Sequence, residues 1–403
     1  MTREELNSQA IELLQTNNNI AIQAATGVGK SKIAIDLCYE VAQRSLGPIK
    51  VLLVVAEIAH INNWKAEMIK WNQPFGEITI ICYASLKNFR NTHWDAVIFD
   101  EAHHLNSDLR LDVFESLVTR YRFFLSATLK DSFIERLEWS CGPIASIKMG
   151  LQDAFDADIL PEPKIKLIPL ELNNTVYSET IIEEWGKKDK RLTATCIYAD
   201  RWKFLRDKKT VPNGKLIIQC TQKQKYDYLC EKFEFYKKRY MCNRNEALKN
   251  KWLQIGSQRK VYLGLLKTQV AKEVLKKLKK KRFICFCTNI NQAEALGGNN
   301  AIHSKKKGNL EIINKFNEGK INSLFAVGML QEGMNLNDIQ AGVIIQLDGE
   351  ERAFIQKFGR TLRADTPEQY IIYFKNTRDE EYLQKALENI DDKYIKRDEI
   401  CNR

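Results

Sequence analysis

The chain has 403 residues, of which 44% are hydrophobic, and a formal charge of +11 at pH 7. This length is enough for two or three domains, and the apolar content excludes a disordered protein. The chain contains no run of about 18 uncharged apolar residues and no apolar segment near its start, so we expect a cytoplasmic protein with no membrane span.

The distribution of cysteines and charges further restricts the kind of protein that this chain can be. The ten cysteines are scattered and include no C-x-x-C pair, which favours reduced thiols over disulfides or a zinc site. Residues 231–282 hold 17 Lys/Arg against 4 Asp/Glu, and the rest of the chain is nearly neutral. Such a segment is either a solvated helical face or a binding surface for a polyanion. Because the excess positive charge is concentrated in this one segment, we favour a binding surface for a polyanion.

The first chemical signal in chain order is a glycine-containing loop. After an amphipathic helix over 4–16, residues 19–23 predict a buried strand and residues 32–41 a helix, with the sequence ATGVGKS between them. In this context backbone N–H groups and the helix N-terminus can bind phosphates, and lysine and hydroxyl side chains can reach the β/γ-phosphates and Mg²⁺. We therefore expect ATP and Mg²⁺ to bind at Thr26, Gly27, Val28, Gly29, Lys30 and Ser31.

Two further signals follow buried strands. Strands are predicted over 51–56, 78–83 and 96–99, and the last ends in Asp100-Glu101-Ala102-His103. Asp-Glu pairs are common in solvated turns, but here the pair follows a buried strand, where α/β sheets place their ligands. Asp100 can then hold Mg²⁺, and Glu101 can act as general base toward water.

A fifth strand over 122–125 leads into Ser126-Ala127-Thr128, whose two hydroxyls could connect the carboxylates to a moving part. Alternating strands and helices up to about residue 150 predict a doubly wound parallel sheet.

The second half of the chain repeats this pattern without a phosphate loop. A Pro-containing linker near 160–163 precedes a strand over 164–172, and residues 173–265 predict a mostly helical, basic insertion. Strands and helices then alternate from 283 to 374. We expect one lobe over 1–150 and a second over 151–403, with the insertion over about 173–265.

The second lobe contains QKFGRTLR at 356–363, in which Arg360 and Arg363 fall on one helix face. Surface arginine pairs are common. The functional alternative is an arginine finger that reaches the γ-phosphate from the second lobe.

Together these pieces resemble a superfamily 2 helicase or translocase of the DEAH-box kind. The matching motifs are ATGVGKS at 25–31, DEAH at 100–103, SAT at 126–128, QEGMNL at 331–336 and QKFGRTLR at 356–363. The context WDAVIFDEAHHL and the segment 51–71 are similar to Swi/Snf-type remodelling translocases and to phage or repair DNA helicases.

The resemblance implies two RecA-like lobes, of the P-loop NTPase class, with ATP·Mg²⁺ in the cleft between them. Lobe 2 would contribute Gln356, Arg360, Arg363 and Gly333 to the ATP site, and Gln9 would read adenine. Nucleotide state would be relayed by His103, Ser126, Ala127 and Thr128. Nucleic acid would contact Ala56, His60, Thr288, Asn289 and Gln331, and the basic insertion would act as an added clamp.

The expected function is ATP-dependent movement along, or remodelling of, nucleic acid. DNA is favoured over RNA and could be single-stranded, duplex or branched, with protein partners in a replication, recombination or repair assembly. Two alternatives are an ATP-gated clamp that does not unwind its substrate and the motor subunit of a larger complex.

Overall fold

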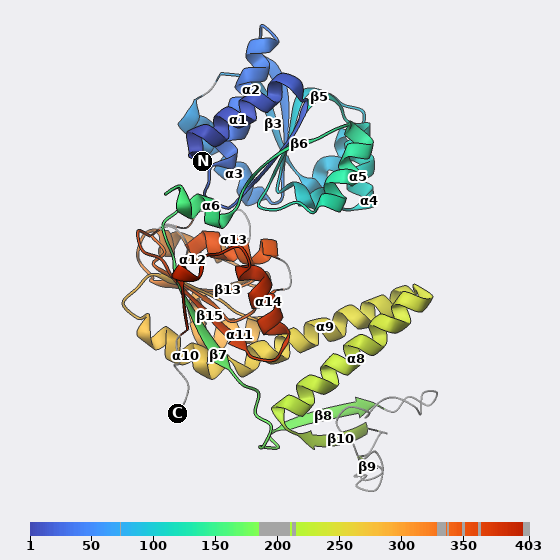
Figure 1. Ribbon diagram of the computed structural model, residues 1–403, viewed down its shortest axis with the longest axis vertical. Helices are drawn as coiled ribbons and strands as arrows, with labels where there is room; N and C mark the ends of the chain where they lie inside the picture. The colour runs from blue at the N-terminus through green and yellow to red at the C-terminus, as the bar shows by residue number, and fades with distance from the viewer. Residues whose placement is uncertain are drawn as a thin grey trace.

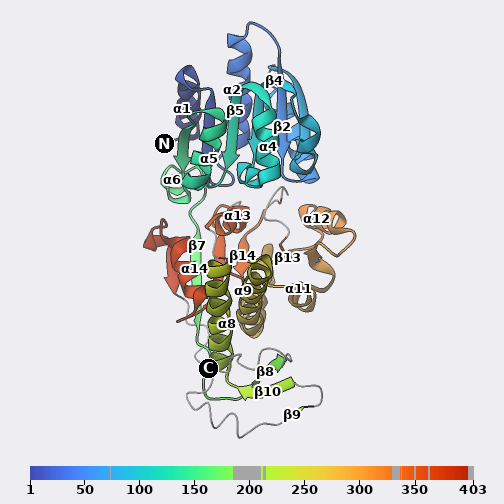
Figure 2. The same cartoon turned by 90° about the vertical axis from the view of Figure 1, so that its right-hand side faces the viewer.

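The computed structural model describes residues 1–72, 74–184, 210–211, 215–328, 336, 338–348, 351–361 and 364–397. These residues form two parallel-sheet lobes and an arm that projects from the second lobe (Figures 1 and 2). Two parallel α/β lobes are the fold class that the sequence predicts, and this prediction is confirmed. None of the helices in the described residues combines the length and apolar composition needed to cross a lipid bilayer.

Lobe 1 is built around a six-stranded, all-parallel sheet in the order β3-β2-β4-β5-β1-β6. Its strands are β1 (Asn19–Ala24), β2 (Ile49–Val55), β3 (Gly76–Cys82), β4 (His93–Asp100), β5 (Val118–Ser126) and β6 (Ala145–Met149). Because every pairing is parallel, the carboxyl ends of these strands lie at one edge, which faces lobe 2 (Figure 1).

Helices cover both faces of this sheet, so its central strands are nearly continuous runs of buried apolar residues. One face packs against α1 (Arg3–Thr16), α2 (Lys30–Arg44) and α3 (Ile58–Trp71). The other packs against η1 (Tyr83–Phe89), η2 (Ala102–Leu105), α4 (Asp108–Ser116) and α5 (Asp131–Cys141).

Lobe 2 contains a seven-stranded sheet, also all-parallel, in the order β12-β13-β11-β14-β15-β7-β16. The strands are β7 (Lys164–Leu170), β11 (Phe283–Phe286), β12 (Ala301–His303), β13 (Ser323–Val327), β14 (Ala341–Ile344), β15 (Glu368–Phe374) and β16 (Ile395–Arg397). The helical elements of the lobe are α10 (Thr268–Lys277), α11 (Ile290–Gly297), η3 (Gly298–Asn300), α12 (Asn309–Asn317), α13 (Glu351–Thr361), α14 (Arg378–Leu387) and η4 (Asp392–Tyr394).

The short helix α6 (Leu151–Asp156) joins the two lobes. Its Phe155 ring packs edge-on against Phe358 of α13 and against Tyr394, with ring centroids 6.4 Å and 5.4 Å apart. Lobe 1 therefore meets lobe 2 through an apolar contact on the helix that carries the QKFGRTLR motif.

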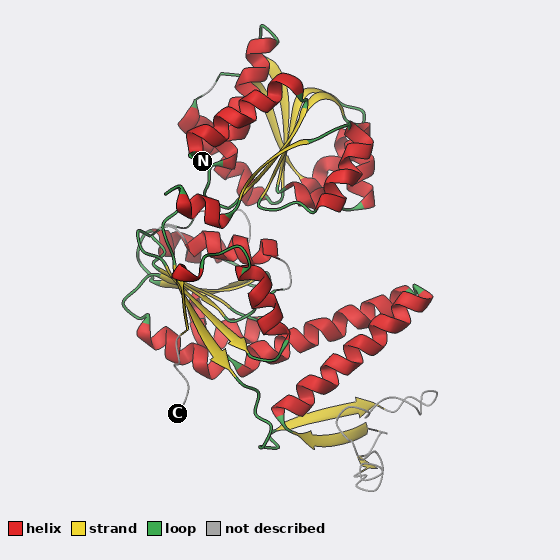
Figure 3. Cartoon of the chain, viewed as in Figure 1, coloured by secondary structure: helices red, strands yellow, loops and turns green. Residues whose placement is uncertain are grey.

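The described residues of the insertion include a small sheet that the sequence does not predict, besides the expected helices. The insertion begins with an antiparallel sheet in the order β8-β10-β9, formed by β8 (Glu179–Glu184), β9 (Thr210–Val211) and β10 (Lys215–Cys220). Two long helices follow, α8 (Gln222–Asn243) and α9 (Glu246–Leu266), which run antiparallel as the arm (Figure 3). Short strands interrupted by charged residues give a weak periodic signal, which explains why the sequence pattern does not predict this sheet.

A buried ion pair fixes the root of the arm to lobe 2. Lys267, which follows α9, is fully buried, and its Nζ lies 2.6 Å from Oδ2 of Asp379 on α14. The same Nζ donates to the carbonyl of Ile345 at 2.7 Å. Burial lowers the pKa of Lys267 below its ordinary value, although the Asp379 carboxylate works against that shift.

We expect Lys267→Met to destabilise the protein by about 3–5 kcal/mol, because it leaves the Asp379 carboxylate buried without its counter-charge. Urea unfolding followed by circular dichroism measures the change. Lys272→Met, which removes an exposed lysine on α10, is the matched control and should stay within about 0.5 kcal/mol of wild type. Equal unfolding midpoints for the two variants would contradict the expectation.

Candidate functional site

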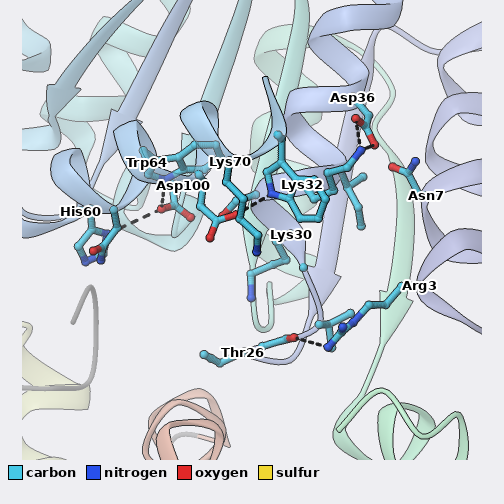
Figure 4. A pocket seen from close by; sticks show the side chains of 18 of the residues that line it. Arg3, Asn7, Thr26, Lys30, Lys32, Asp36, His60, Trp64, Lys70 and Asp100 are labelled. Atoms are coloured by element: carbon cyan, nitrogen blue, oxygen red, sulfur yellow. Dashed lines mark hydrogen bonds and ion pairs between the residues drawn. The ribbon is translucent and has the colours of Figure 1, made fainter. Parts of the chain in front are cut away.

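The loop between β1 and α2 borders a cavity of about 660 Å³ in lobe 1 (Figure 4). Gly27 and Gly29 have φ values of +95° and +116°, a left-handed conformation that would strain any other residue. Lys30 opens α2, and its Nζ donates to the carbonyl of Ala24 at 2.6 Å. A turn of this kind, followed directly by a helix N-terminus, suits an anionic ligand. The cavity is lined by all six residues expected to hold ATP: Thr26, Gly27, Val28, Gly29, Lys30 and Ser31.

Asp100 and Glu101 line the same cavity from the end of β4. Oδ2 of Asp100 accepts a 2.8 Å hydrogen bond from Nε1 of Trp64 on α3, and its Oδ1 accepts one from the backbone N–H of Glu101 at 3.1 Å. These bonds hold the carboxylate in one orientation. The sequence does not single out Trp64, because a buried tryptophan on an amphipathic helix normally indicates only a core position.

Glu101 lines the cavity and also contacts a residue in the interior of lobe 1. Its backbone has a φ of +50°, which is strained for a residue other than glycine and is typical of functional positions. Oε2 of Glu101 lies 3.4 Å from Nδ1 of His103, which is itself 3.4 Å from Oγ of Ser126. Ser126 donates to the carbonyl of Thr128 at 2.9 Å. The structure thus brings Glu101, His103, Ser126 and Thr128 together, and Ala127 is buried between the last two.

His60 lines the cavity beside the glycine-containing loop and does not lie in an exposed loop. It is buried, and its Nδ1 is 3.7 Å from Oδ2 of Asp100. The reason is that α3 begins at Ile58, so His60 falls in the first helical turn and points toward β4. Ala56, the other residue expected in this loop, directly follows β2 and does not line the cavity.

On α1, the cavity is lined by Arg3, Glu4 and Asn7 and not by Gln9. Gln9 is exposed, because it lies two positions after Asn7 and therefore on a different side of the helix. Oδ1 of Asn7 is buried and has no hydrogen-bond partner in the described residues, while Arg3 donates to the carbonyl of Gly27 at 3.2 Å. The four-residue spacing from Arg3 to Asn7 is the sequence signal that could have identified this face.

Lobe 2 approaches the phosphate loop through α13. A Cβ built on Gly359 would lie 2.8 Å from Cβ of Thr26, so the two backbones meet with no room for a side chain. Gln356 is buried in the same helix. The side chain of Arg360 lies outside the described part of the structure, as do Arg363, Gln331 and Gly333.

Thr288 and Asn289 both take structural positions at the start of α11. Oδ1 of Asn289 accepts the backbone N–H of Gln292 at 2.9 Å and so caps the helix. Oγ1 of Thr288 is buried, because α9 passes directly over it at Gly264.

Among the described residues there is no cluster of three or more His, Cys, Asp or Glu side chains that could hold a metal by themselves. Ser31 and Asp100, the two residues expected to hold Mg²⁺, both line the cavity. Two protein oxygen donors fit an ion held mainly by ligand phosphates and water.

Two protein families match separate parts of the chain. Residues 2–131 match the family described as type III restriction enzyme, res subunit, and residues 266–365 match the helicase conserved C-terminal domain. Both stretches carry the motifs discussed above.

One curated relative and two solved structures extend the comparison. The chain is 22% identical over 388 residues to the DNA 3'-5' translocase XPB2 of Sulfurisphaera tokodaii, covering 86% of this chain and 75% of the relative. Its fold is similar to that of S. cerevisiae Dbp5 bound to RNA and ADP BeF3, with a TM-score of 0.56, 12% identity, and 98% and 89% of the two chains covered. The type ISP restriction-modification enzyme LlaBIII bound to DNA also has a TM-score of 0.56, at 12% identity, over 98% of this chain and 30% of the enzyme.

We expect Gly359→Ala to lower the ATPase kcat about ten- to hundredfold and to raise KM for ATP, because the added methyl group pushes α13 away from Thr26. Alanine favours a helix over glycine, so the melting temperature should not fall, and this separates displacement from unfolding. Gly47→Ala is the matched control, since a Cβ there meets no heavy atom within 4 Å. Wild-type kinetics in Gly359→Ala would show that the contact is dispensable.

Proposed function

We propose that this chain, an ATP-hydrolysing helicase or translocase of superfamily 2, acts on DNA and moves along it. The two family matches, one in each lobe, and the two-lobed fold support that class. The choice of DNA rests on the relative that spans most of both chains, whose name gives DNA translocation as its activity. The observation that carries the proposal is the phosphate loop of lobe 1 in direct contact with the QKFGRTLR helix of lobe 2.

Lobe 1 binds and activates ATP in this proposal. The N–H groups of the phosphate loop and the N-terminus of α2 hold the phosphates, and Lys30 turns from the carbonyl of Ala24 to the β/γ-phosphates. Ser31 and Asp100 hold Mg²⁺, which supplies charge neutralisation of the phosphates when bound. Glu101 accepts a proton from the attacking water. The buried Oδ1 of Asn7 fits an amino group of the base, a role that the sequence suggested for Gln9.

Lobe 2 supplies the charges that complete the site when the lobes close. Gln356, Arg360 and Arg363 lie on or directly after α13, the helix whose Gly359 meets Thr26. An arginine delivered to the γ-phosphate stabilises the negative charge of the transition state. Closure is favoured only while ATP bridges both lobes, so hydrolysis releases it. Gly333 is proposed to contact the same ligand.

The Glu101–His103–Ser126 path is suited to relay that cycle to the nucleic acid. A change in the hydrogen bonding of Glu101 on hydrolysis alters the partner of His103, and through Ser126 it reaches the loop at Thr128. Ala56, Asn289 and Gln331 remain the proposed contacts of the two lobes with the phosphate backbone. The DEAH-box subtype, the Swi/Snf-like character and an assembly in replication, recombination or repair belong to the same proposal, and RNA is the less favoured substrate.

The arm is proposed as an additional contact with the phosphate backbone. Its distal half exposes four cations that have no carboxylate partner among the described residues: Lys238, Arg239, Arg244 and Lys251. Trp252 of α9 packs between Phe233 and Tyr240 of α8, with ring centroids 5.7 Å from each. This aromatic contact stiffens the two helices that carry the cations.

We expect Glu101→Gln to bind ATP and to lower turnover about 100- to 10,000-fold, because the amide cannot accept the proton of water. ATP hydrolysis is measured alone and with single-stranded DNA, duplex DNA, forked DNA or RNA, beside a titration with a fluorescent ATP analogue. Wild-type turnover that no nucleic acid stimulates would contradict the motor function. If only RNA stimulates ATP hydrolysis, the substrate is RNA and not DNA.

For the arm, we expect replacement of its four distal cations by Gln to reduce the slope of log affinity against log salt by about 0.9 for each duplex phosphate that the arm then leaves unneutralised. Fluorescence anisotropy with labelled duplex DNA at a series of NaCl concentrations gives the slope. Replacing Lys276, Lys277, Lys279 and Lys280, four exposed lysines at and after the end of α10, is the charge-matched control. An equal reduction of the slope in both variants would show that the distal arm is not a specific contact, and that DNA binds elsewhere or along the whole basic segment.

A further inference from the structure

The root of the arm rests on two parts of lobe 2 that belong to the proposed motor. At the first, α9 crosses the start of α11: a Cβ on Gly264 would lie 1.9 Å from Oγ1 of Thr288. Gln292, which is buried, donates to the carbonyl of Gly264 at 2.9 Å and accepts the N–H of Thr288 at 2.8 Å. This contact is close and polar, so α9 cannot move without carrying α11 with it.

The second contact is a chain of three charges that ends on α13. Oδ1 of Asp348 lies 3.5 Å from Nζ of Lys260 on α9, and its Oδ2 lies 2.6 Å from Nζ of Lys357 on α13. Lys357 also donates to the carbonyl of Gln346 at 3.1 Å. One carboxylate is therefore shared between the arm and the QKFGRTLR helix.

The two halves of this chain differ in strength. Lys357 has a side chain that is only 7% exposed, whereas that of Lys260 is 37% exposed and partly screened by water. Burial by itself would raise the pKa of Asp348, but the charges and hydrogen bonds of Lys357, then of Lys260, outweigh burial and leave the pKa below its ordinary value. Asp348 thus stays ionised at neutral pH and attracts both lysines.

Lys357 occupies a sensitive position in the sequence. It directly follows Gln356 and lies two residues before Gly359, whose backbone touches Thr26 of the phosphate loop. A small displacement of Lys357 moves the part of α13 that must approach ATP. The buried pair of Lys267 and Asp379 anchors the C-terminal end of α9 close by, so α9 can move only by rotating about that end, and such a rotation carries Lys260 with it.

We propose that Lys260 and Asp348 are positioning residues that couple the arm to α13, so that nucleic acid held on the arm raises the rate of ATP hydrolysis. When the phosphate backbone of a bound nucleic acid attracts α9, the distance between Lys260 and Asp348 changes. Asp348 then shifts Lys357, and with it α13, relative to the phosphate loop. This inference rests on the proposed function, because it requires ATP hydrolysis that nucleic acid stimulates.

The test compares two lysines of the same helix. Lys260→Met removes the coupling charge, and Lys251→Met removes a distal charge that has no carboxylate partner in the described residues. ATPase rates are measured over a titration with duplex DNA. Lys260→Met should lower kcat at saturating DNA about three- to fivefold. Lys251→Met should raise the DNA concentration needed for half-maximal rate and leave the saturating kcat unchanged.

Two further variants separate coupling from a structural effect. Lys260→Arg retains the charge and should restore most of the saturating kcat. In an Asp348→Asn background, Lys260→Met should have no additional effect, because the shared carboxylate is already gone. A saturating kcat for Lys260→Met equal to that of Lys251→Met, or an equal additional decrease in the Asp348→Asn background, would overturn the inference while the proposed function stands. A wild-type rate that no nucleic acid changes would overturn both.

Discussion

The close approach of Gly359 to Thr26 determines how the two lobes of this protein can work together. A helix from one lobe meets the phosphate loop of the other at a separation that only a missing Cβ permits. The carboxyl edge of the lobe 1 sheet, where ligands bind in α/β proteins, faces this contact (Figure 1). In lobe 2, by contrast, β7 and β15 run away from lobe 1 and end at the root of the arm. The apolar packing of Phe155 on Phe358 holds the two lobes in register beside it.

Lobe 2 contains two ion pairs whose lysines are buried. Lys267 with Asp379, and Lys357 with Asp348, are taken out of water at a cost that only close pairing offsets. Such pairs add little net stability compared with apolar residues, but they fix the relative orientation of the elements that carry them, because each charge accepts one partner in one geometry. Here they determine how the arm is attached and how α13 is oriented, which are the two features that a motor needs to keep aligned.

The two lobes also divide the electrostatic work. In the proposed function, lobe 1 offers backbone N–H groups, one lysine and two carboxylates, all lining one cavity, to ATP and its metal ion. The arm presents isolated cations on a rigid pair of helices, an arrangement suited to a long polyanion whose spacing varies. Separate surfaces for the two kinds of phosphate allow each to be bound and released without competition, and the coupling must then travel through protein.

Short windows of sequence were sufficient for the fold class and for the succession of strand, glycine-containing loop and helix near the start of lobe 1. Runs of buried residues such as Val51–Val55 and Ala96–Phe99 encode parallel strands locally, and the phosphate loop is a local structure of successive residues. The direction in which side chains face was set by tertiary packing instead. Packing placed His60 beside Asp100, Asn7 and not Gln9 at the cavity, and Thr288 beneath α9. It also brought Lys260, Asp348 and Lys357 together from residues up to 97 positions apart along the chain. A contact of this kind cannot be predicted from a short segment of sequence, because it depends on how whole helices pack and on the register in which they do so.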